Sequence, residues 1–294
     1  MKKYNKLYLS VIIALICMIA LVSCQEEIDI ALDSTYVRLV IDGSINTDTT
    51  VHKVRLSTSG DALNKEPGHA ISNAFVTISD GTTLFTLKEN SANPGTYETD
   101  PNVYGVPGKT YILNISNVDV NGDGTMENYT ASSFLPIENP IDSIKVQYNR
   151  GNPHRKEWLV DLFAQEIGGG RNFYLMKAYK NDTLVTDSMY EYINIADNTG
   201  FEGKYYDGFP VYTFSGDKID EKVRIGDVIT LEMDGITEEY EKFIYGFISE
   251  YYPKIPIFSG PSANVPTNII PKDKAVGFFT AYSAVRKRVV YKGE

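Results

Sequence analysis

The sequence predicts a mostly-β protein: an N-terminal immunoglobulin-like sandwich followed by a second β-rich domain with one amphipathic helix. Composition is the first observation. Tyrosine occurs 21 times among 294 residues, together with many Val, Ile, Thr and Phe residues, which pack well on the pleated surface of a sheet. Second, glycine, asparagine and aspartate recur between short apolar runs, as turn residues do. Third, one segment has the apolar period of a helix that packs on a core.

Residues 36–135 contain seven short strand-like runs, and their regular spacing is typical of an immunoglobulin-like or related sandwich. In the first run, Val37, Leu39 and Ile41 alternate with more polar residues, as one buried face requires. Asp80-Gly81 separates two runs and predicts a tight hairpin, because glycine accepts the positive φ of a primed turn. The predicted strands are residues 36–41, 52–57, 74–79, 83–87, 95–99, 110–115 and 129–134.

Two prolines, Pro136 and Pro140, bracket a segment without a strand pattern and predict a domain boundary. The second β-rich domain then covers residues 141–294. Its predicted strands are residues 142–148, 158–164, 173–179, 211–214, 228–233, 275–282 and 289–291.

Residues 238–251 predict the amphipathic helix. Thr237 can cap its first turn, and Glu238 and Glu239 suit the positive end of the helix dipole. Pro253 follows its end. We expect one continuous apolar stripe to pack on a sheet, because its positions recur at i, i+3, i+4, i+7, i+8 and i+11. The stripe consists of Tyr240, Phe243, Ile244, Phe247, Ile248 and Tyr251.

Residues 1–23 have the organisation of a secretory signal peptide. Three lysines precede an apolar run over residues 7–22, which ends in Leu21-Val22-Ser23-Cys24. This ending is a lipobox: two apolar residues, a small residue and a cysteine. The thiol of Cys24 then carries a diacylglycerol, and acyl chains such as palmitate hold the mature chain on a membrane. The alternative is a signal-anchor helix, which needs about 20 apolar residues, more than this run supplies.

Cysteine content and charge exclude several function classes. The chain has two cysteines, Cys17 and Cys24. The first leaves with the signal peptide and the second is acylated, so the mature chain has no thiol nucleophile, disulfide or thiolate metal site. The formal net charge is −10, and removal of residues 1–23 takes away three lysines and no acids. A chain this acidic is unsuited to nucleic acid.

Residues 119–127 contain a candidate calcium loop. Asp119, Asn121, Asp123 and Glu127 place oxygen donors at loop positions 1, 3, 5 and 9, and Gly124 occupies position 6, where the loop of an EF-hand has a glycine. The match is incomplete, because position 12 is not the glutamate of an EF-hand and a strand precedes the loop. The alternative is a polar hairpin tip without metal.

Residues 203–212 are a candidate binding patch, with Tyr205, Tyr206, Phe209 and Tyr212 beside polar groups. Flat aromatic faces next to polar groups suit a glycan or a peptide. The alternative is that these rings belong to the core. The chain contains no catalytic signature: its three histidines lie far apart in the sequence, and no glycine elbow surrounds a serine. We therefore expect no enzyme.

Several segments together resemble a family of domain-of-unknown-function lipoproteins from Bacteroidota, typically encoded beside TonB-dependent transporters of the SusC/RagA type. The resemblance implies no catalytic residues and an accessory role in nutrient uptake. The segments are the lipobox with its following acidic residues, Leu39-Val40-Ile41-Asp42-Gly43, residues 95–97, residues 107–111, the aromatic helix, residues 262–269 and residues 276–283.

The resemblance also gives meaning to the tether, residues 24–35. Gln25, Glu26, Glu27 and Asp29 follow the anchor directly, and acidic stretches of this kind resemble the signal that sends lipoproteins of Bacteroidota to the cell surface. The alternative is a merely solvated tether.

We thus expect an outward-facing outer-membrane lipoprotein, a non-catalytic binding or structural accessory to a TonB-dependent transporter. The alternatives are a glycan- or peptide-processing hydrolase of the cell envelope and an adhesin-like structural module.

Overall fold

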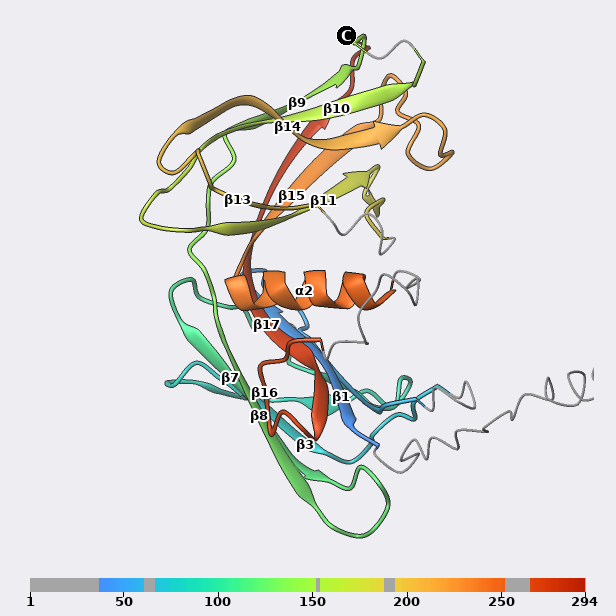
Figure 1. The fold of residues 1–294 in the computed structure, drawn as a ribbon, viewed down its shortest axis with the longest axis vertical. Coiled ribbons are helices and arrows are strands. Elements are labelled where there is room, and N and C mark those ends of the chain that lie inside the picture. Colours follow the sequence, from blue (N-terminus) through green and yellow to red (C-terminus); the bar gives the residue numbers. More distant parts are fainter. Residues whose placement is uncertain (1–36, 61–66, 152–153, 188–193, 252–264, 294) are drawn as a thin grey trace, which may run out of the picture. The chain divides into compact units, whose positions relative to one another are not determined.

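The computed structural model describes residues 37–60, 67–151, 154–187, 194–251 and 265–293 (Figure 1). Within these ranges the chain is mostly β with a single helix, as predicted. The signal peptide, Cys24, the acidic residues Gln25, Glu26, Glu27 and Asp29, and the tether lie outside the described residues.

The strands form three sheets. The largest has nine strands in the order β12-β11-β15-β17-β1-β2-β6-β5, with β13 paired to β11; the second is β16-β8-β7-β3-β4; the third is β14-β10-β9. Their bounds are β1 Leu39–Asn46, β2 Lys53–Thr58, β3 Phe75–Ser79, β4 Leu84–Thr86, β5 Lys88–Glu89, β6 Thr96–Glu98, β7 Thr110–Val118, β8 Glu127–Phe134, β9 Ser143–Tyr148, β10 Glu157–Gln165, β11 Phe173–Lys180, β12 Thr183–Leu184, β13 Ile195–Asp197, β14 Tyr205–Ser215, β15 Val228–Ile236, β16 Ile269–Ile270 and β17 Ala275–Val290.

Strand β17 connects the two parts of the large sheet. Its first half pairs in parallel with β1, from Leu39 opposite Ala275 to Asn46 opposite Tyr282. Its second half pairs antiparallel with β15, from Gly235 opposite Ser283 onward. The prediction of two separate strands, residues 275–282 and 289–291, is thus wrong: one strand of 16 residues contains the first segment and all of the second except Tyr291. The segment between Pro136 and Pro140 lies between β8 and β9.

The N-terminal core lies between the β1-β2-β6 part of the large sheet and the five-stranded sheet, so the predicted sandwich is confirmed. Alternation along β7 shows how the sequence builds it: Tyr111, Leu113 and Ile115 are buried, and the residues between them face outward. The hairpin predicted at Asp80-Gly81 joins β3 to β4. Its loop is longer than predicted, because Ser79 pairs with Leu84.

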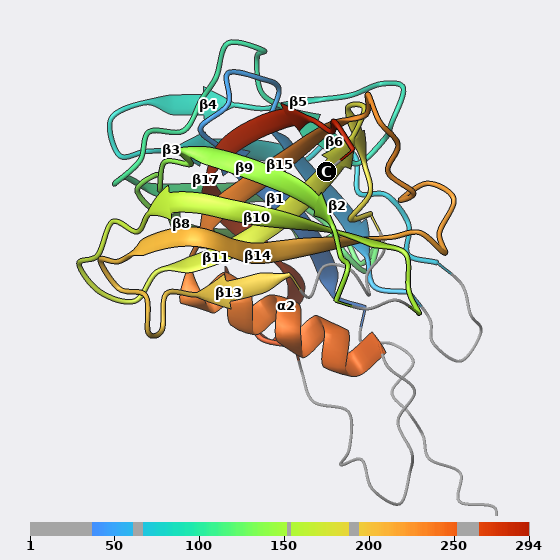
Figure 2. The same ribbon diagram turned by 90° about the horizontal axis from the view of Figure 1, so that it is seen from above.

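In the second half, the two faces of β11 pack on different partners. Tyr174 and Met176 join the core shared with β9, β10 and β14. Phe173 and Leu175 join the smaller core shared with the helix α2, Glu238–Tyr251. Figures 1 and 2 show β11 and β15 lying between the β9-β10-β14 layer and α2. Each face of these strands is apolar because each packs on a different layer.

Helix α2 has the bounds predicted from the sequence, and Thr237 caps it: its Oγ1 accepts a bond of 3.2 Å from the backbone N of Tyr240. Ile244 and Ile248 are buried in the core. The expectation that the whole stripe is core is wrong for Phe247, which is 44% exposed. This ring extends past the edge of the contact and lines the cavity described next.

Candidate functional site

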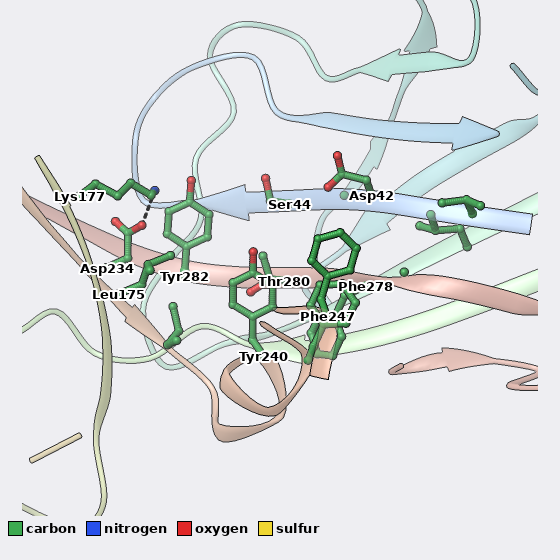
Figure 3. Close-up of a pocket in the computed structure, with 16 residues that line it drawn as sticks. Asp42, Ser44, Leu175, Lys177, Asp234, Tyr240, Phe247, Phe278, Thr280 and Tyr282 are labelled. Carbon is green, nitrogen blue, oxygen red and sulfur yellow. Dashed lines mark ion pairs between the residues drawn. The ribbon is translucent and has the colours of Figure 1, made fainter. Parts of the chain in front are cut away.

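A cavity of about 500 Å³ lies between α2 and the face of the large sheet that α2 covers (Figure 3). Its walls come from β1, β11, β15 and β17 on the sheet side and from one face of α2. Strands from both ends of the chain meet here, because β1 and β17 are neighbours in parallel register. The volume falls within the range of about 300–1,000 Å³ that is usual for small-molecule sites.

Strand alternation places the lining side chains. Along β17, Phe278, Thr280 and Tyr282 line the cavity, whereas Phe279 and Ala281 belong to the N-terminal core. The side chains of the neighbouring strand β1 are placed by the same alternation. This side of the cavity is therefore positioned by strands and not by loops. Sites built on strands are held more rigidly than sites built on loops.

One end of the cavity is aromatic. The rings of Tyr240 and Phe243 on α2 lie 5.3 and 5.1 Å from the ring of Phe278 on β17, measured between centroids. Phe247 extends this row one helical turn further, 6.2 Å from Phe243 and stacked on it. Burial raises the pKa of Tyr240, so its phenol stays neutral and can donate a hydrogen bond. This wall offers flat apolar surface.

The other end is charged. Lys177 on β11 forms an ion pair with Asp234 on β15, drawn in Figure 3, and donates a bond of 2.9 Å to Glu232. Its ammonium also lies 5.0 Å from the ring centroid of Tyr282. Burial opposes the charge of Lys177, but the neighbouring acidic groups, Asp234 first among them, outweigh burial and raise its pKa. Burial raises the pKa of Asp234 to about 7.

A network that runs from buried Glu232 to the surface supports this charged end from behind. Glu232 accepts bonds from Tyr179 at 2.9 Å and from Arg286 Nε at 2.6 Å. Arg286 in turn binds both carboxylate oxygens of Asp48 at 2.8 Å. Burial opposes ionisation of Glu232, but Lys177 and Arg286 overcome it and lower its pKa. Lys177 is therefore held by two carboxylates of β15, and one of them, Glu232, is held in turn by Tyr179 and Arg286.

Three polar groups of the cavity keep hydrogen-bonding capacity. Oδ1 of Asp234 and Oγ1 of Thr280 are buried and lack hydrogen-bond partners within the described part of the chain. Asp42 on β1 is exposed and lines the same cavity. Buried polar atoms without partners are uncommon in folded proteins, and a bound ligand or water is one way in which they are satisfied.

The candidate calcium loop connects β7 to β8, as the hairpin alternative predicts. Its oxygens already accept hydrogen bonds: the two carboxylate oxygens of Asp119 bind the backbone N of Gly122 and Gly124 at 2.8 and 2.9 Å. Asn121 donates to Asp123 at 2.9 Å.

Glu127, the remaining candidate ligand, pairs with Lys274 and accepts the hydroxyl of Tyr129. In the ranges that the structure describes, no three His, Cys, Asp or Glu side chains gather as metal ligands.

The candidate binding patch divides into core and surface. Tyr206 is buried and Tyr212 half-buried, both against the C-terminal core. Tyr205 and Phe209 are 46% and 41% exposed. The sequence analysis missed Phe201, whose ring lies 4.9 Å from Tyr206 and 5.1 Å from Phe209. None of the four predicted residues lines the cavity.

The cavity itself was not predicted from the sequence. Three of the segments that line it were recognised only as motifs of the resembling family: residues 39–43, the aromatic helix and residues 276–283. The signal available was charge inside apolar strands: Lys177 lies in β11 and Asp234 in β15 among buried residues. Charged residues in strands that pack on both faces point to a paired or functional site.

One property of the structure and two comparisons with known proteins bear on identity. Among the residues that the structure describes, no helix has the length and apolar character needed to span a membrane. A search of curated proteins finds no match. The model of one family, described as a domain of unknown function (DUF4249), matches residues 25–288. This match covers most of the chain and all of the cavity-lining segments, and the chain therefore belongs to the DUF4249 family.

Proposed function

We propose that this protein is a lipid-anchored protein of the outer-membrane surface and a non-catalytic binding accessory to a TonB-dependent nutrient transporter. The observation that carries the binding role is the cavity between α2 and β17, with aromatic rings at one end and polar groups without partners at the other. The lipobox at Cys24 and the acidic residues after it support the location. The resemblance to lipoproteins encoded beside SusC/RagA-type transporters supports the accessory role.

The arrangement favours binding over hydrolysis. Two carboxylates, Asp42 and Asp234, line the cavity, and a hydrolase of the classical two-carboxylate kind needs both free to act on one bond. Asp234 is engaged by Lys177, which is itself fixed by Glu232. A carboxylate held in this way serves to place Lys177 and to accept one further hydrogen bond through Oδ1.

The lipid anchor makes a modest interface with the transporter sufficient. Two proteins held on one membrane meet at a high effective concentration, so a weak contact gives high occupancy. An interface of about 1,000 Å² is enough for a specific complex. The exposed rings of Tyr205 and Phe209 on β14 are the first candidate contact, because half-exposed aromatic rings are typical anchors of interfaces.

Location is tested by protease treatment of intact cells and by fractionation. We expect external protease to remove the wild-type protein, since its domain faces outward. The variant Cys24→Ala has no acyl chain, so any of it that is cut before residue 24 is expected in the soluble fraction. Protection of the wild-type protein until the outer membrane is breached would contradict the surface location. A Cys24→Ala chain that is still cut at the same point and yet stays on the membrane without detergent would contradict the anchor.

A further inference from the structure

We infer that the cavity between α2 and β17 binds a neutral carbohydrate, a mono- or disaccharide, by stacking one sugar face on the aromatic wall and donating hydroxyl groups to the polar end. This inference rests on the proposed binding role and names its ligand class. Three properties of the cavity carry it: its aromatic surface, its excess of hydrogen-bond acceptors, and its balance of charge.

The aromatic wall requires a ligand with a flat apolar side. Phe243 and Phe278 lie 5.1 Å apart between centroids, and Phe247 continues the row toward solvent with 44% of its surface exposed. Aromatic faces carry partial negative charge, so they attract the weakly positive C–H groups that cover one side of a sugar ring. A linear polar ligand would leave this surface uncovered.

The polar end requires a ligand rich in hydrogen-bond donors. Oδ1 of Asp234 can only accept while the carboxylate is ionised, and Asp42 adds a further carboxylate at the cavity wall. Oγ1 of Thr280 can accept or donate. Hydroxyl groups of a ligand satisfy all three. Because a buried acceptor without a partner is costly, a hydrogen bond donated to Asp234 stabilises the complex more than the same bond would in water.

The charges disfavour ionic ligands of either sign. Lys177 already fills the position that a cation would take, in ion pair with Asp234 and over the ring of Tyr282. A second cation there would meet its charge at close range in a partly desolvated site. An anion would meet Asp42 and Asp234. The neutral ligand class is the one that neither end repels.

Three sugars with the same ring test the class directly: neutral glucose, anionic glucuronate and cationic glucosamine, within a panel of neutral mono- and disaccharides. The full chain is used in a detergent without a sugar headgroup, and binding is followed by saturation-transfer NMR and calorimetry. We expect at least one neutral sugar to bind with a Kd of about 1 mM or tighter. We expect glucuronate and glucosamine to bind about fivefold or more weakly than glucose or its neutral relatives.

Phe247→Ala and Tyr245→Ala form a matched pair on α2, because their side chains are 44% and 43% exposed and only Phe247 lines the cavity. We expect Phe247→Ala to weaken sugar binding about tenfold, and Tyr245→Ala to leave it within about twofold. Asp42→Asn should weaken binding less than Phe247→Ala, because the amide oxygen still accepts.

Three results would overturn the inference: no neutral sugar binding at about 10 mM, tighter binding of a charged sugar than of every neutral one, or equal loss in both helix variants. Co-purification with a transporter does not depend on these results. If sugars fail while the transporter co-purifies, the ligand class is wrong and the accessory role stands. If a neutral sugar binds while no transporter co-purifies, the ligand class stands and the accessory role is wrong.

Discussion

Gly277 pairs with Ile41 across the parallel ladder that joins β17 to β1, and a Cβ at position 277 would lie 2.0 Å from the carbonyl oxygen of Ile41. The φ angle of Gly277 is +95°, a region that residues with side chains rarely adopt. Both restrictions require glycine here. The close approach brings β1 alongside β17, and with it Asp42 into the cavity next to Phe278.

Gly277→Ala should therefore destabilise the protein by about 2 kcal/mol or more, measured by urea denaturation, because it adds a backbone clash to a strained φ. Gly81→Ala is the control. Its φ is +84°, and its added Cβ meets nothing within 4 Å, so it should cost only the conformational part, about 1 kcal/mol. Equal effects in the two variants would show that the approach of β1 to β17 is not tight.

Lys177→Met should cost about 3–5 kcal/mol, the usual loss when one partner of a buried ion pair is removed. The substitution leaves Asp234 buried without its cation, and Glu232 with Arg286 alone. The double variant Lys177→Met/Asp234→Asn should recover part of the loss, since the uncompensated charge is gone. A double variant less stable than the single one would contradict this account of the pair.

The pH dependence of the free energy of unfolding should show the raised pKa of Asp234. Burial raises its pKa from the ordinary value of 3.8 to about 7 in the folded protein, so the folded state binds this proton more tightly than the unfolded state. Stability from this group is present at low pH and is lost as pH rises through the interval between these values. Asp234→Asn removes this contribution. The stability difference, wild type minus Asp234→Asn, should fall between pH 5 and pH 7, and a flat difference would contradict the raised pKa.

Glu166→Gln should destabilise the C-terminal half by about 2–4 kcal/mol. The carboxylate of Glu166 is buried and accepts bonds from the backbone N of Gly168 and Gly203 at 2.7 and 2.6 Å. Asn172, Asn198 and Tyr174 also donate to it. A glutamine would turn one acceptor oxygen into an NH₂ group facing donors. Thermal unfolding measures the effect. Glu202→Gln is the control that should change little, because its carboxylate is exposed and accepts a bond from the backbone N of Gly170.

Ile244→Ala should cost about 2–5 kcal/mol, because Ile244 is buried against β11 and β15. Phe247→Ala should cost less than about 1.5 kcal/mol, because nearly half of the ring is already exposed. Chemical denaturation of the two variants separates a stability effect from a binding effect at Phe247. A loss at Phe247 as large as that at Ile244 would mean that the ring is part of the core.

Local pattern was enough to predict most elements. The bounds of α2 follow from its period, and the strands of the N-terminal sandwich follow from alternation and glycine punctuation. The continuity of β17 was not predictable in this way. Arg286 and Arg288 interrupt its apolar pattern. The strand continues there because it pairs with β15, and ion pairs with Glu232, Asp48 and Asp182 hold the two arginines.

The cavity depends on pairing across the whole chain. Asn46 donates to the hydroxyl of Tyr282 at 2.9 Å across 236 positions, and no local period records such a contact. Composition drew attention instead to Tyr206 and Tyr212, which are core residues. Many tyrosines in a sequence indicate β-sheets as much as binding surfaces. The burial of each ring had to be known before core rings could be told from exposed ones.

The accessory role is tested most directly by quantitative affinity purification from outer membranes in mild detergent. We expect the wild-type chain to bring down one large TonB-dependent transporter at near-equal amounts. The double variant Tyr205→Ser/Phe209→Ser should reduce that yield about tenfold or more, because it removes both exposed rings of β14. Ile219→Ser, at a side chain that is 89% exposed and lies outside β14, should leave the yield unchanged. A wild-type chain that purifies alone would contradict the account.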